Sequence, residues 1–340
     1  MKSIYYYMLA GLTLSTSGCS RWLSEDDAPV MSYDYYETEA GVNAAITAAY
    51  GFLCWGVGGE RFDVLTEHGT DLFTEGEDGS HRESYNKYAT QLNPDDGILY
   101  EMWQNHYKGI SDANIAMQKI LDSRDLLENV KSQSYAEMQF IRAYLYFDLV
   151  QQFGRIPLVS EGSFDIRTSF KRAPVADIYN LIISDLRNAV ENLPEKVSTK
   201  GRATCYSAAH LLSKVYLTRG SAVSDQRGQK ATDMDSTLYY AEKVINSGVF
   251  ALQENFSSLW DISNQGNSEV VFAVQFTTEP MFNGDGNKQH LYWLSWYEDQ
   301  PGMLRDIANG RPFRRHVATK KTMDDLYDRL HDSRFYKSFK

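Results

Sequence analysis

Four large aromatic side chains lie close together in residues 291–297, and they are the residues of this sequence best suited to contact a ligand. They are Tyr292, Trp293, Trp296 and Tyr297, and they are flanked by His290, Glu298, Asp299 and Gln300. Such rings bury apolar surface, while the hydroxyl, indole and flanking polar groups form hydrogen bonds. The pattern predicts a binding surface, with Trp293 and Trp296 as first candidates. The alternative is a buried strand or helix face.

The sequence carries no motif for covalent or metal-assisted catalysis. Gly-x-Ser-x-Gly and His-Glu-x-x-His are both missing, and the seven histidines have no recognised spacing. The glycines of residues 56–59 are not followed by Gly-Lys-Ser/Thr, which favours a flexible helix exit over a phosphate cradle. A glycosidase needs two carboxylates, but no spacing selects a pair among 45 acidic residues. We therefore expect a non-catalytic protein, with a glycoside hydrolase as an alternative.

We expect no cofactor. Residues 283–287 (NGDGN) offer oxygen atoms to calcium but lack the full loop pattern and its bidentate glutamate, so a plain turn is the preferred interpretation. The three cysteines, Cys19, Cys54 and Cys205, are too few for a disulfide framework or a four-cysteine zinc site. Cys54 and Cys205 either form one disulfide or remain small core residues.

The overall composition is that of a folded, acidic protein. The 340 residues include 34 Lys and Arg against 45 Asp and Glu, a net charge of −11, and 43% of them are hydrophobic. This length suffices for one large or two ordinary domains. The acidic residues are spread along the chain, which argues against nucleic acid as a partner. Aromatic residues at 13% exceed the needs of a core and leave rings for a surface.

The first residues read as a targeting segment. Lys2 precedes the apolar run 4–14, which is too short for a permanent membrane helix, and the run leads to Ser17-Gly18-Cys19. We interpret residues 1–18 as a signal peptide, Cys19 as a lipidated cysteine and residues 19–38 as a tether. This reading rests on similarity to a bacterial lipoprotein cleavage box, and an ordinary signal peptide is the alternative. Diacylated lipid holds a protein firmly at a membrane.

Six segments show helical spacing of apolar residues, and the fold class is therefore predicted to be mostly α. The segments are connected so that neighbours run antiparallel and bury one another's apolar faces, as in a tetratricopeptide-like helical-repeat scaffold. Gly109 is expected to break the second helix, and Thr204 and Ser236 are expected to cap the last two. The predicted helices are 39–53, 98–120, 134–153, 174–193, 204–220 and 236–248.

Two long irregular regions and one strand complete the predicted architecture. Residues 270–276 alternate apolar and smaller side chains and predict a strand, the minor β element. Periodicity is lost in residues 59–96 and 279–315, where Gly, Asp and Asn abound. Long loops in a compact domain are usually functional, so we expect ligand-binding loops near 55–96 and 277–318.

The third predicted helix contains a long distinctive motif, residues 136–150 (AEMQFIRAYLYFDLV), which is followed by 153–159 (FGRIPLV) and, further on, by 208–217 (AAHLLSKVYL) and 240–245 (YAEKVI). Together these segments resemble the signature of the SusD/RagB family of nutrient-binding outer-membrane lipoproteins. Gln139 stands where many members carry Arg. Members of the family continue well past the end of residues 39–340, so we expect this domain to be truncated at its C-terminus.

The resemblance implies a function for the aromatic residues. It implies a lipoprotein on the outer face of the outer membrane that holds oligosaccharide over a TonB-dependent (SusC-like) transporter. Sugar rings stack their C–H faces on aromatic rings and pair their hydroxyls with polar groups. The resemblance also puts Trp55, Arg61 and Asp71 in one wall of the ligand site, and helical spacing puts Trp103 in the core. Two alternatives remain open: an oligopeptide-binding member of the family, and a helical-repeat scaffold or adhesion protein.

Overall fold

The computed structural model describes residues 38–79, 81–89, 92–162, 168–277, 279, 286–305, 310–326, 328 and 330–338. The predicted signal peptide, Cys19 and the tether up to residue 37 lie outside the described residues. So do positions 283–285 of the candidate calcium loop.

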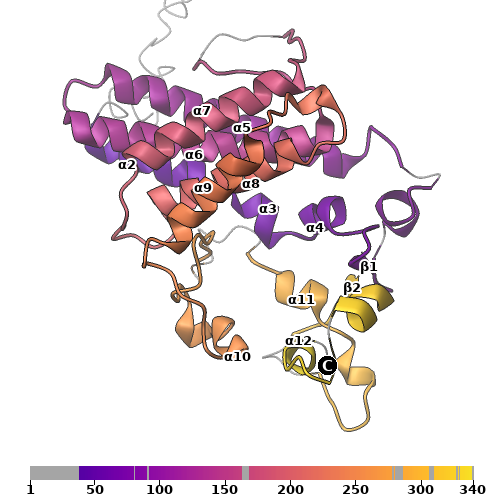
Figure 1. Ribbon diagram of the computed structural model, residues 1–340. Coiled ribbons are helices and arrows are strands. Elements are labelled where there is room, and N and C mark those ends of the chain that lie inside the picture. Colours follow the sequence, from indigo (N-terminus) through magenta and orange to yellow (C-terminus); the bar gives the residue numbers. More distant parts are fainter. Residues whose placement is uncertain are drawn as a thin grey trace, which may run out of the picture.

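The described residues are mostly α-helical, as predicted (Figure 1). The long elements are α2 (Glu39–Gly51), α5 (Gly97–Asp122), α6 (Glu128–Phe153), α7 (Val175–Asn192), α8 (Cys205–Gly220) and α9 (Asp233–Ile245). The short helices are α3 (Cys54–Gly58), α4 (Glu60–Thr66), α10 (Phe256–Leu259), α11 (Gln289–Trp293) and α12 (Phe335–Ser338), with π-helical turns η3 (Arg82–Asn86) and η7 (Thr322–Leu326) and 3₁₀ turns η4 (Asp225–Arg227), η5 (Ile262–Asn264) and η6 (Tyr297–Asp299). The strands are β1 (Phe73–Glu75) and β2 (His316–Ala318).

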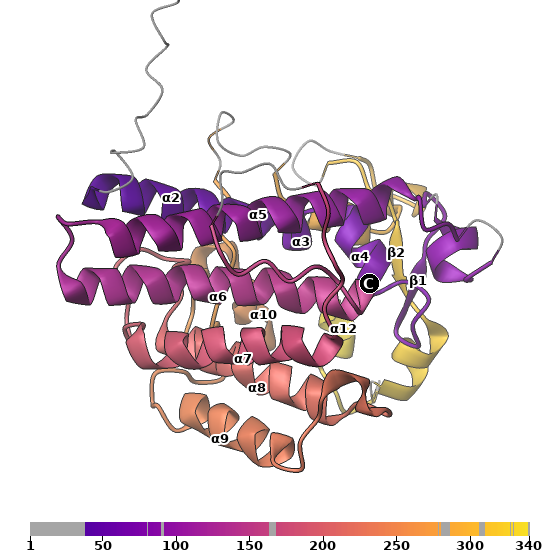
Figure 2. The same cartoon turned by 90° about the horizontal axis from the view of Figure 1, so that it is seen from above.

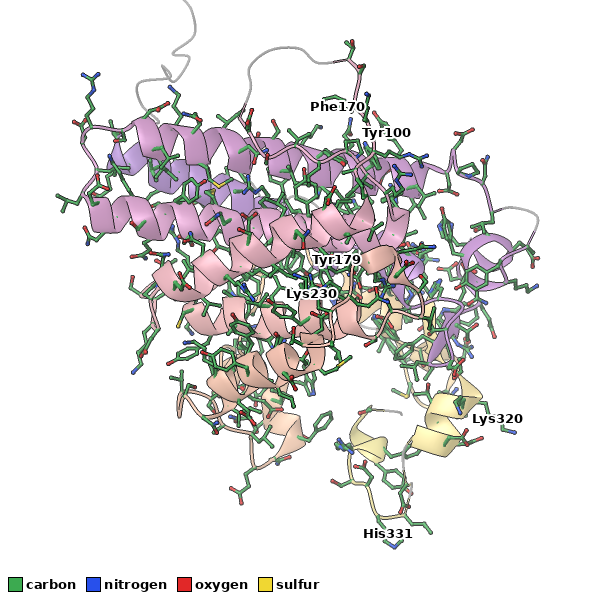
Figure 3. The ribbon with its side chains drawn as sticks, turned by 45° about the horizontal axis from the view of Figure 1, so that its top comes forward. Tyr100, Phe170, Tyr179, Lys230, Lys320 and His331 are labelled. Atoms are coloured by element: carbon green, nitrogen blue, oxygen red, sulfur yellow. The ribbon has the colours of Figure 1, made fainter. Side chains whose placement is uncertain are left out.

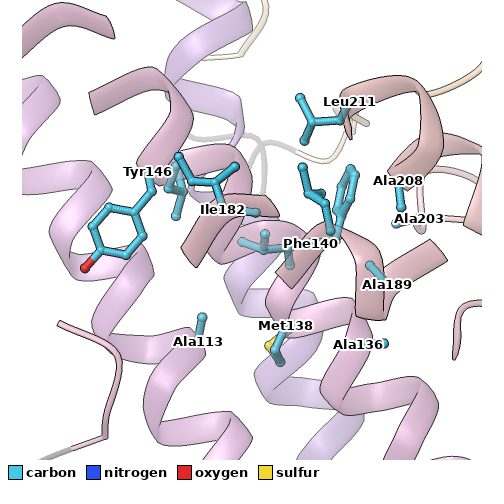
Figure 4. Packing of buried hydrophobic residues seen from close by; sticks show 14 of the residues in the cluster. Ala113, Ala136, Met138, Phe140, Tyr146, Ile182, Ala189, Ala203, Ala208 and Leu211 are labelled. Carbon is cyan, nitrogen blue, oxygen red and sulfur yellow. The ribbon is translucent and has the colours of Figure 1, made fainter. Parts of the chain in front are cut away.

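The long helices form one layer. Seen from above, α2, α5, α6, α7, α8 and α9 follow one another across it, and each helix from α5 to α9 packs against the next (Figure 2). Because α6 also contacts α2 and α8, it is covered on nearly all sides. Phe140, Ile141 and Tyr146 of α6 are at most 1% exposed, and Phe140 and Tyr146 lie in the packed cluster of Figure 4. The helical-repeat prediction is confirmed.

Gly109 does not break the second helix, contrary to the prediction. Helix α5 runs without interruption from Gly97 to Asp122. A β-carbon at Gly109 would lie 2.6 Å from Cδ1 of Leu145 and 2.9 Å from Cγ of Phe52. The absence of a side chain therefore lets α5 approach its neighbours closely, a role that outweighs the weak helix propensity of glycine.

Two other predicted helix boundaries are wrong. Helix α6 begins at Glu128, before the predicted start at 134, and Ser236 lies inside α9, which begins at Asp233. The first helix ends at Gly51, before the glycines as predicted, and the separate short helix α3 contains Gly56 and Gly58. The cap at Thr204 is confirmed, since its hydroxyl accepts a hydrogen bond from the Ser207 amide in a reciprocal capping box. Polar residues near a helix start fit several registers, and tertiary packing selects one.

Residues 270–276 do not form the predicted strand. They run alongside the helices without a partner strand, and the sheet of the described residues consists of β1 and β2 alone. Val271, Phe272 and Val274 pack against the main core, and the Phe272 ring lies 5.2 Å from that of Phe140. The apolar residues of this segment are therefore used in contact with the helical layer. The contacts do not alternate, because the adjacent Val271 and Phe272 both reach the core.

Residues 39–58, which contain α2 and α3, are long and apolar enough to cross a membrane by length and composition alone. In the fold, Val42, Ile46, Ala49 and Leu53 are at most 2% exposed and belong to the main core. This segment therefore forms the first helices of the layer.

A buried ion pair joins α6 to α7. The Arg142 guanidinium donates to both carboxylate oxygens of Asp185 at 2.8 Å, and both residues are at most 4% exposed. Arg142 also donates to Oδ1 of Asn114 on α5 at 2.6 Å and to the Ser160 carbonyl at 3.0 Å. Gln139, the position that departs from the family pattern, donates to Asp185 at 3.0 Å. One charged group thus links three helices and the loop that follows α6.

Replacing Asp185 with asparagine should strongly destabilise the protein. Asp185→Asn keeps the shape of the side chain but leaves the Arg142 charge buried without a counter-ion, which typically costs about 3–5 kcal/mol. Urea unfolding followed by circular dichroism measures this loss. Asp177→Asn, an exposed position in the first turn of the same helix, is the control and should cost about 1 kcal/mol or less. Equal losses in the two variants would contradict a central role for the pair.

Candidate functional site

The two regions predicted as separate loops fold into one unit beside the helical layer (Figure 1). Strand β1 from the first pairs antiparallel with β2 from the second, with Thr74 opposite Val317. The amide of Lys288 donates to the Gly58 carbonyl at 3.2 Å. Val64 and Tyr85 of the first region form a small core with Ile98 at the start of α5. We call these packed residues, 58–79 with 286–297 and 313–319, the aromatic unit.

Trp293 lies inside the aromatic unit and is only partly exposed. Its ring centre is 4.8 Å from that of Phe73 on β1 and 4.9 Å from that of His316 on β2. Its indole N–H donates to the side chain of Gln289 at 2.8 Å. With its hydrogen bond satisfied and two rings packed on it, Trp293 holds α11 against the sheet.

Tyr292 lies next to a stacked arginine. The Arg315 guanidinium is 5.4 Å from the Tyr292 ring centre and 4.8 Å from that of Phe313, and it forms an ion pair with Glu60 of α4. Cation–π contacts of this kind favour a fixed ring position. The Tyr292 ring is half-buried, as are the other three rings of residues 292–297.

Trp296 and Tyr297 lie at the edge of the unit. The Arg314 guanidinium is 5.6 Å from the Trp296 ring centre and pairs with Glu77 at 3.3 Å, while the Tyr297 hydroxyl donates to the Gly310 carbonyl at 3.0 Å. A half-exposed indole beside an arginine and a carboxylate offers both a stacking face and hydrogen-bonding groups. Of the four predicted rings, Trp296 is the one best placed to contact a ligand.

The three residues predicted for the other wall are spread out. Trp55 packs edge-on against Phe62 and against His106 of α5, and Arg61 pairs with Glu101 of α5. Their neighbours therefore lie on α4 and α5 and not in residues 291–297. Asp71 is exposed at the aromatic unit, and its carbonyl accepts a hydrogen bond from Thr319.

The structure also contains a buried cluster that sequence reasoning missed. Nε2 of His68 and Nδ1 of His316 are 2.7 Å apart, and Nε2 of His316 lies 3.3 Å from the Asp63 carboxylate. Both histidines are at most 3% exposed. They are 248 residues apart in the chain, so no local spacing could reveal the pair. The cluster connects α4 to β2 and thus the two halves of the aromatic unit.

Burial shifts the pKa values of all three groups. It lowers the pKa of His316 to about 3 and of His68 to about 4, because desolvation disfavours the charged imidazolium; neighbouring cations add to the effect. Burial raises the pKa of Asp63 to about 6, with the carboxylates of Glu67 and Glu60 adding to the effect. At neutral pH both histidines are therefore uncharged. A single N–H proton then lies in the hydrogen bond between Nε2 of His68 and Nδ1 of His316.

The His68–His316 pair should make the protein less stable in mild acid. Between about pH 6 and pH 4 the unfolded chain protonates both histidines, whose ordinary pKa is 6.5, while the folded cluster takes up one proton, at Asp63. The unfolded state then binds more protons, and stability falls as pH falls. His316→Gln removes this difference in bound protons between the unfolded and folded states. The melting temperature of the variant should therefore decrease less between pH 7 and pH 4.5 than that of the unmodified protein.

His290→Gln, an exposed position on α11, is the matched control for this experiment and should behave as the unmodified protein does. The same acid-induced decrease in melting temperature in His316→Gln and in His290→Gln would contradict the assignment.

Two hollows lie on the helical layer, away from the aromatic unit. One has a volume of about 470 Å³ between α7, α8 and the start of α9, and the other, of about 440 Å³, lies among α5, α6 and α7. None of the predicted ligand residues lines either hollow. Among the described residues, no three His, Cys, Asp or Glu side chains are grouped to hold a metal ion, and Cys54 and Cys205 are free thiols.

A layer of stacked antiparallel helices with a loop-built aromatic unit defines the class of protein as a helical-repeat protein. Residues 31–217, more than half of the sequence, match the SusD-like_3 family, described as starch-binding and associating with the outer membrane. The chain belongs to this family, and the resemblance seen in the sequence is confirmed.

Known relatives agree in sequence and in fold. SusD-like protein P2 of Formosa agariphila is 28% identical over 92% of this chain and 63% of its own length. A laminarin-binding SusD-like protein has 28% identity and a TM-score of 0.59 over 69% of this chain and 50% of its own. A SusD superfamily protein of Parabacteroides distasonis, at 22% identity, has a TM-score of 0.68 over 85% of this chain and 60% of its own. The chain thus spans about half to two thirds of these relatives.

Proposed function

We propose that this protein binds oligosaccharides through the aromatic unit, with Trp296 as the main stacking ring. The observation that carries the proposal is the position of Trp296: a half-exposed indole at the edge of a unit that two distant chain regions build together, with Arg314 and Glu77 beside it. An exposed ring face suits the C–H side of a sugar, and the flanking charged groups suit its hydroxyls. The 28% identity to a laminarin-binding protein supports the same ligand class.

Trp293, Tyr292 and Tyr297 have supporting roles in this proposal. Their contacts with Phe73, Arg315 and Gly310 hold the segment that presents Trp296. Asp71 can extend the polar rim because it is exposed at the same unit. We propose that Trp55 and Arg61 contact the ligand only when it is long enough to extend along α4.

We propose in addition that the protein is attached to the outer membrane through lipid at Cys19, faces the cell exterior and passes its ligand to a TonB-dependent transporter. The family description, which associates its members with the outer membrane, supports this location. Binding without bond cleavage is sufficient for that role. Release of reducing ends from laminarin during incubation with the protein would contradict it.

Trp296→Ala should weaken laminarin binding about three- to tenfold, the loss expected for one ring stacking contact. Isothermal titration calorimetry with laminarin measures the affinity, and melting temperature reports whether the fold is kept. Trp260→Ala is the matched control, since Trp260 is 73% exposed after α10 and lies outside the aromatic unit. Trp293→Ala is a poor substitute, because it would also loosen the packing of α11.

Other results would support other functions. Binding of a peptide library with no response to any sugar on a glycan array would favour an oligopeptide-binding member of the family. Retention of a macromolecular partner in pull-downs by the Trp296→Ala and Trp293→Ala variants, with no sugar shifting the melting temperature, would favour a scaffold or adhesion protein.

A further inference from the structure

The hollow between α7, α8 and α9 is a polar groove on a different part of the molecule from the aromatic unit. Its volume is about 470 Å³, within the range of small-molecule sites. One row of residues along α7 forms its first side, including Ser184 and Arg187, and the segment before α9 forms the second, including Lys230 and Thr232. Lys230 is labelled in Figure 3, beside the ribbon of the helical layer.

The floor of the groove contains a buried hydroxyl whose proton is not engaged. Tyr216 of α8 lines the groove and is only 2% exposed; its hydroxyl lies near Arg187, which can only donate, and within the described residues it has no hydrogen bond of good geometry. Its ring is fixed by stacking on Tyr240, with centres 5.9 Å apart and planes 7° apart. A buried polar atom without a partner is costly unless something fills the site. Tyr216 can therefore donate to a group bound in the groove.

The groove also holds two cations that lack a counter-ion. In the part of the chain that the structure describes, neither Arg187 nor Lys230 forms an ion pair with a carboxylate. The charge of Arg219 on the floor is neutralised by Asp233, to which it donates at 2.6 and 3.0 Å. Glu191 at one end is the acidic residue of the lining. The lining thus carries an excess of positive charge on a protein whose net charge is −11.

The Arg187 guanidinium lies over the Tyr216 ring, with its carbon 5.9 Å from the ring centre, and it interacts with the hydroxyls of both Tyr216 and Tyr240. An anionic group beside this pair would accept one charged hydrogen bond from Arg187 and one neutral hydrogen bond from Tyr216. Ser184, exposed one turn before Asn188 on the same row of α7, adds a hydroxyl.

The start of α9 lies along the same groove. Thr232, the residue before the helix, makes no capping hydrogen bond through its side chain, and both Thr232 and Ser236 line the hollow. The first turn of a 13-residue helix adds a partial positive charge, although Asp233 and Asp235 in that turn reduce it. Arg187, Lys230 and Tyr216 remain the groups that decide the chemistry of the site.

We propose that this groove is a second ligand site, which binds a short sugar carrying a carboxylate or a sulfate group. Arg187 and Lys230 pair with the anionic group, Tyr216 donates to it from the floor, and the hydroxyls of Ser184 and Thr232 contact the sugar. Neutral regions of a glycan gain nothing from the two cations, so the site selects for charge. It acts independently of the aromatic unit, with which it shares no residue.

The test compares acidic sugars with their neutral counterparts on the whole chain. Cellobiouronic acid against cellobiose, and 6′-sulfated lactose against lactose, are titrated by calorimetry, so that the two arms separate carboxylate from sulfate. At least one acidic sugar should bind measurably tighter than its neutral counterpart. Because charge-assisted hydrogen bonds are lost, Arg187→Gln and Lys230→Gln should each weaken that binding about tenfold.

The controls distinguish binding in the groove from general electrostatic attraction of an anion to the protein. Lys214→Gln removes an exposed cation of α8 outside the groove and should leave binding unchanged. Tyr216→Phe removes only the hydroxyl and should weaken binding of the acidic sugar, whereas Trp260→Ala, at a position outside both the groove and the aromatic unit, should not. Equal affinity for acidic and neutral sugars, no measurable binding of either acidic sugar, or unchanged binding in both Arg187→Gln and Lys230→Gln would overturn the proposal. Arg187 and Lys230 are both exposed, so replacing either one should leave the protein folded. A loss of binding in these variants would therefore report on the groove itself.

Discussion

The buried charge of Arg142 constrains the helical layer more than any single apolar contact does. An arginine inside a core is tolerated only when its donors are satisfied, because the desolvation cost of the charge is otherwise not offset. Here Asp185, Asn114 and the Ser160 carbonyl accept those donors. Three helices must therefore keep the relative register that brings these acceptors together. Apolar side chains alone would allow helices to slide by a turn at modest cost, whereas this network allows one arrangement.

The helical layer in turn positions the aromatic unit through very small residues. Gly58 at the end of α3 has no side chain, and a β-carbon there would lie 2.5 Å from the Phe276 ring. The same residue offers its carbonyl to the Lys288 amide just before α11. Gly58 thus acts by allowing close approach, whereas a β-carbon at Gly56 or Gly59 would make only ordinary contacts at 3.6 Å. The contact at Gly58 helps to bring residues 286–297 against residues 58–79.

The helices could be predicted from the sequence, whereas the strands could not. Apolar residues repeat along α6 and α7 at helical spacing, and burial against neighbouring helices requires that repeat. Strands β1 and β2 have three residues each, and their pairing joins positions more than 240 residues apart, such as Phe73 and Ala318. The apparent strand at 270–276 shows the converse, since apolar residues that suggest a strand also serve a segment that packs on a helical layer without a partner strand.

The same distinction applies to the candidate site. Composition and spacing identified the ring cluster at 291–297, because large aromatic residues are conspicuous in any sequence. The surroundings of each ring depend on contacts from distant segments: the rings of Phe73 and His316 pack on Trp293, whereas the half-buried Trp296 lies beside the Arg314 guanidinium. Trp55 and Arg61 were assigned to the site by resemblance, and their partners on α5 are visible only in the fold.

The polar groove follows from the helical layer by a different route. Helix α7 must bury one face against α6 and α8, and its opposite edge is then left to line a surface whose other wall is the start of α9. Stacking of Tyr216 on Tyr240 fills the gap between α8 and α9 with rings but leaves one hydroxyl unsatisfied at the floor. An acidic protein repels anions over most of its surface, so anion recognition requires a local excess of cations. The groove has that excess because Asp233 is committed to Arg219, which leaves Arg187 and Lys230 without an acidic partner.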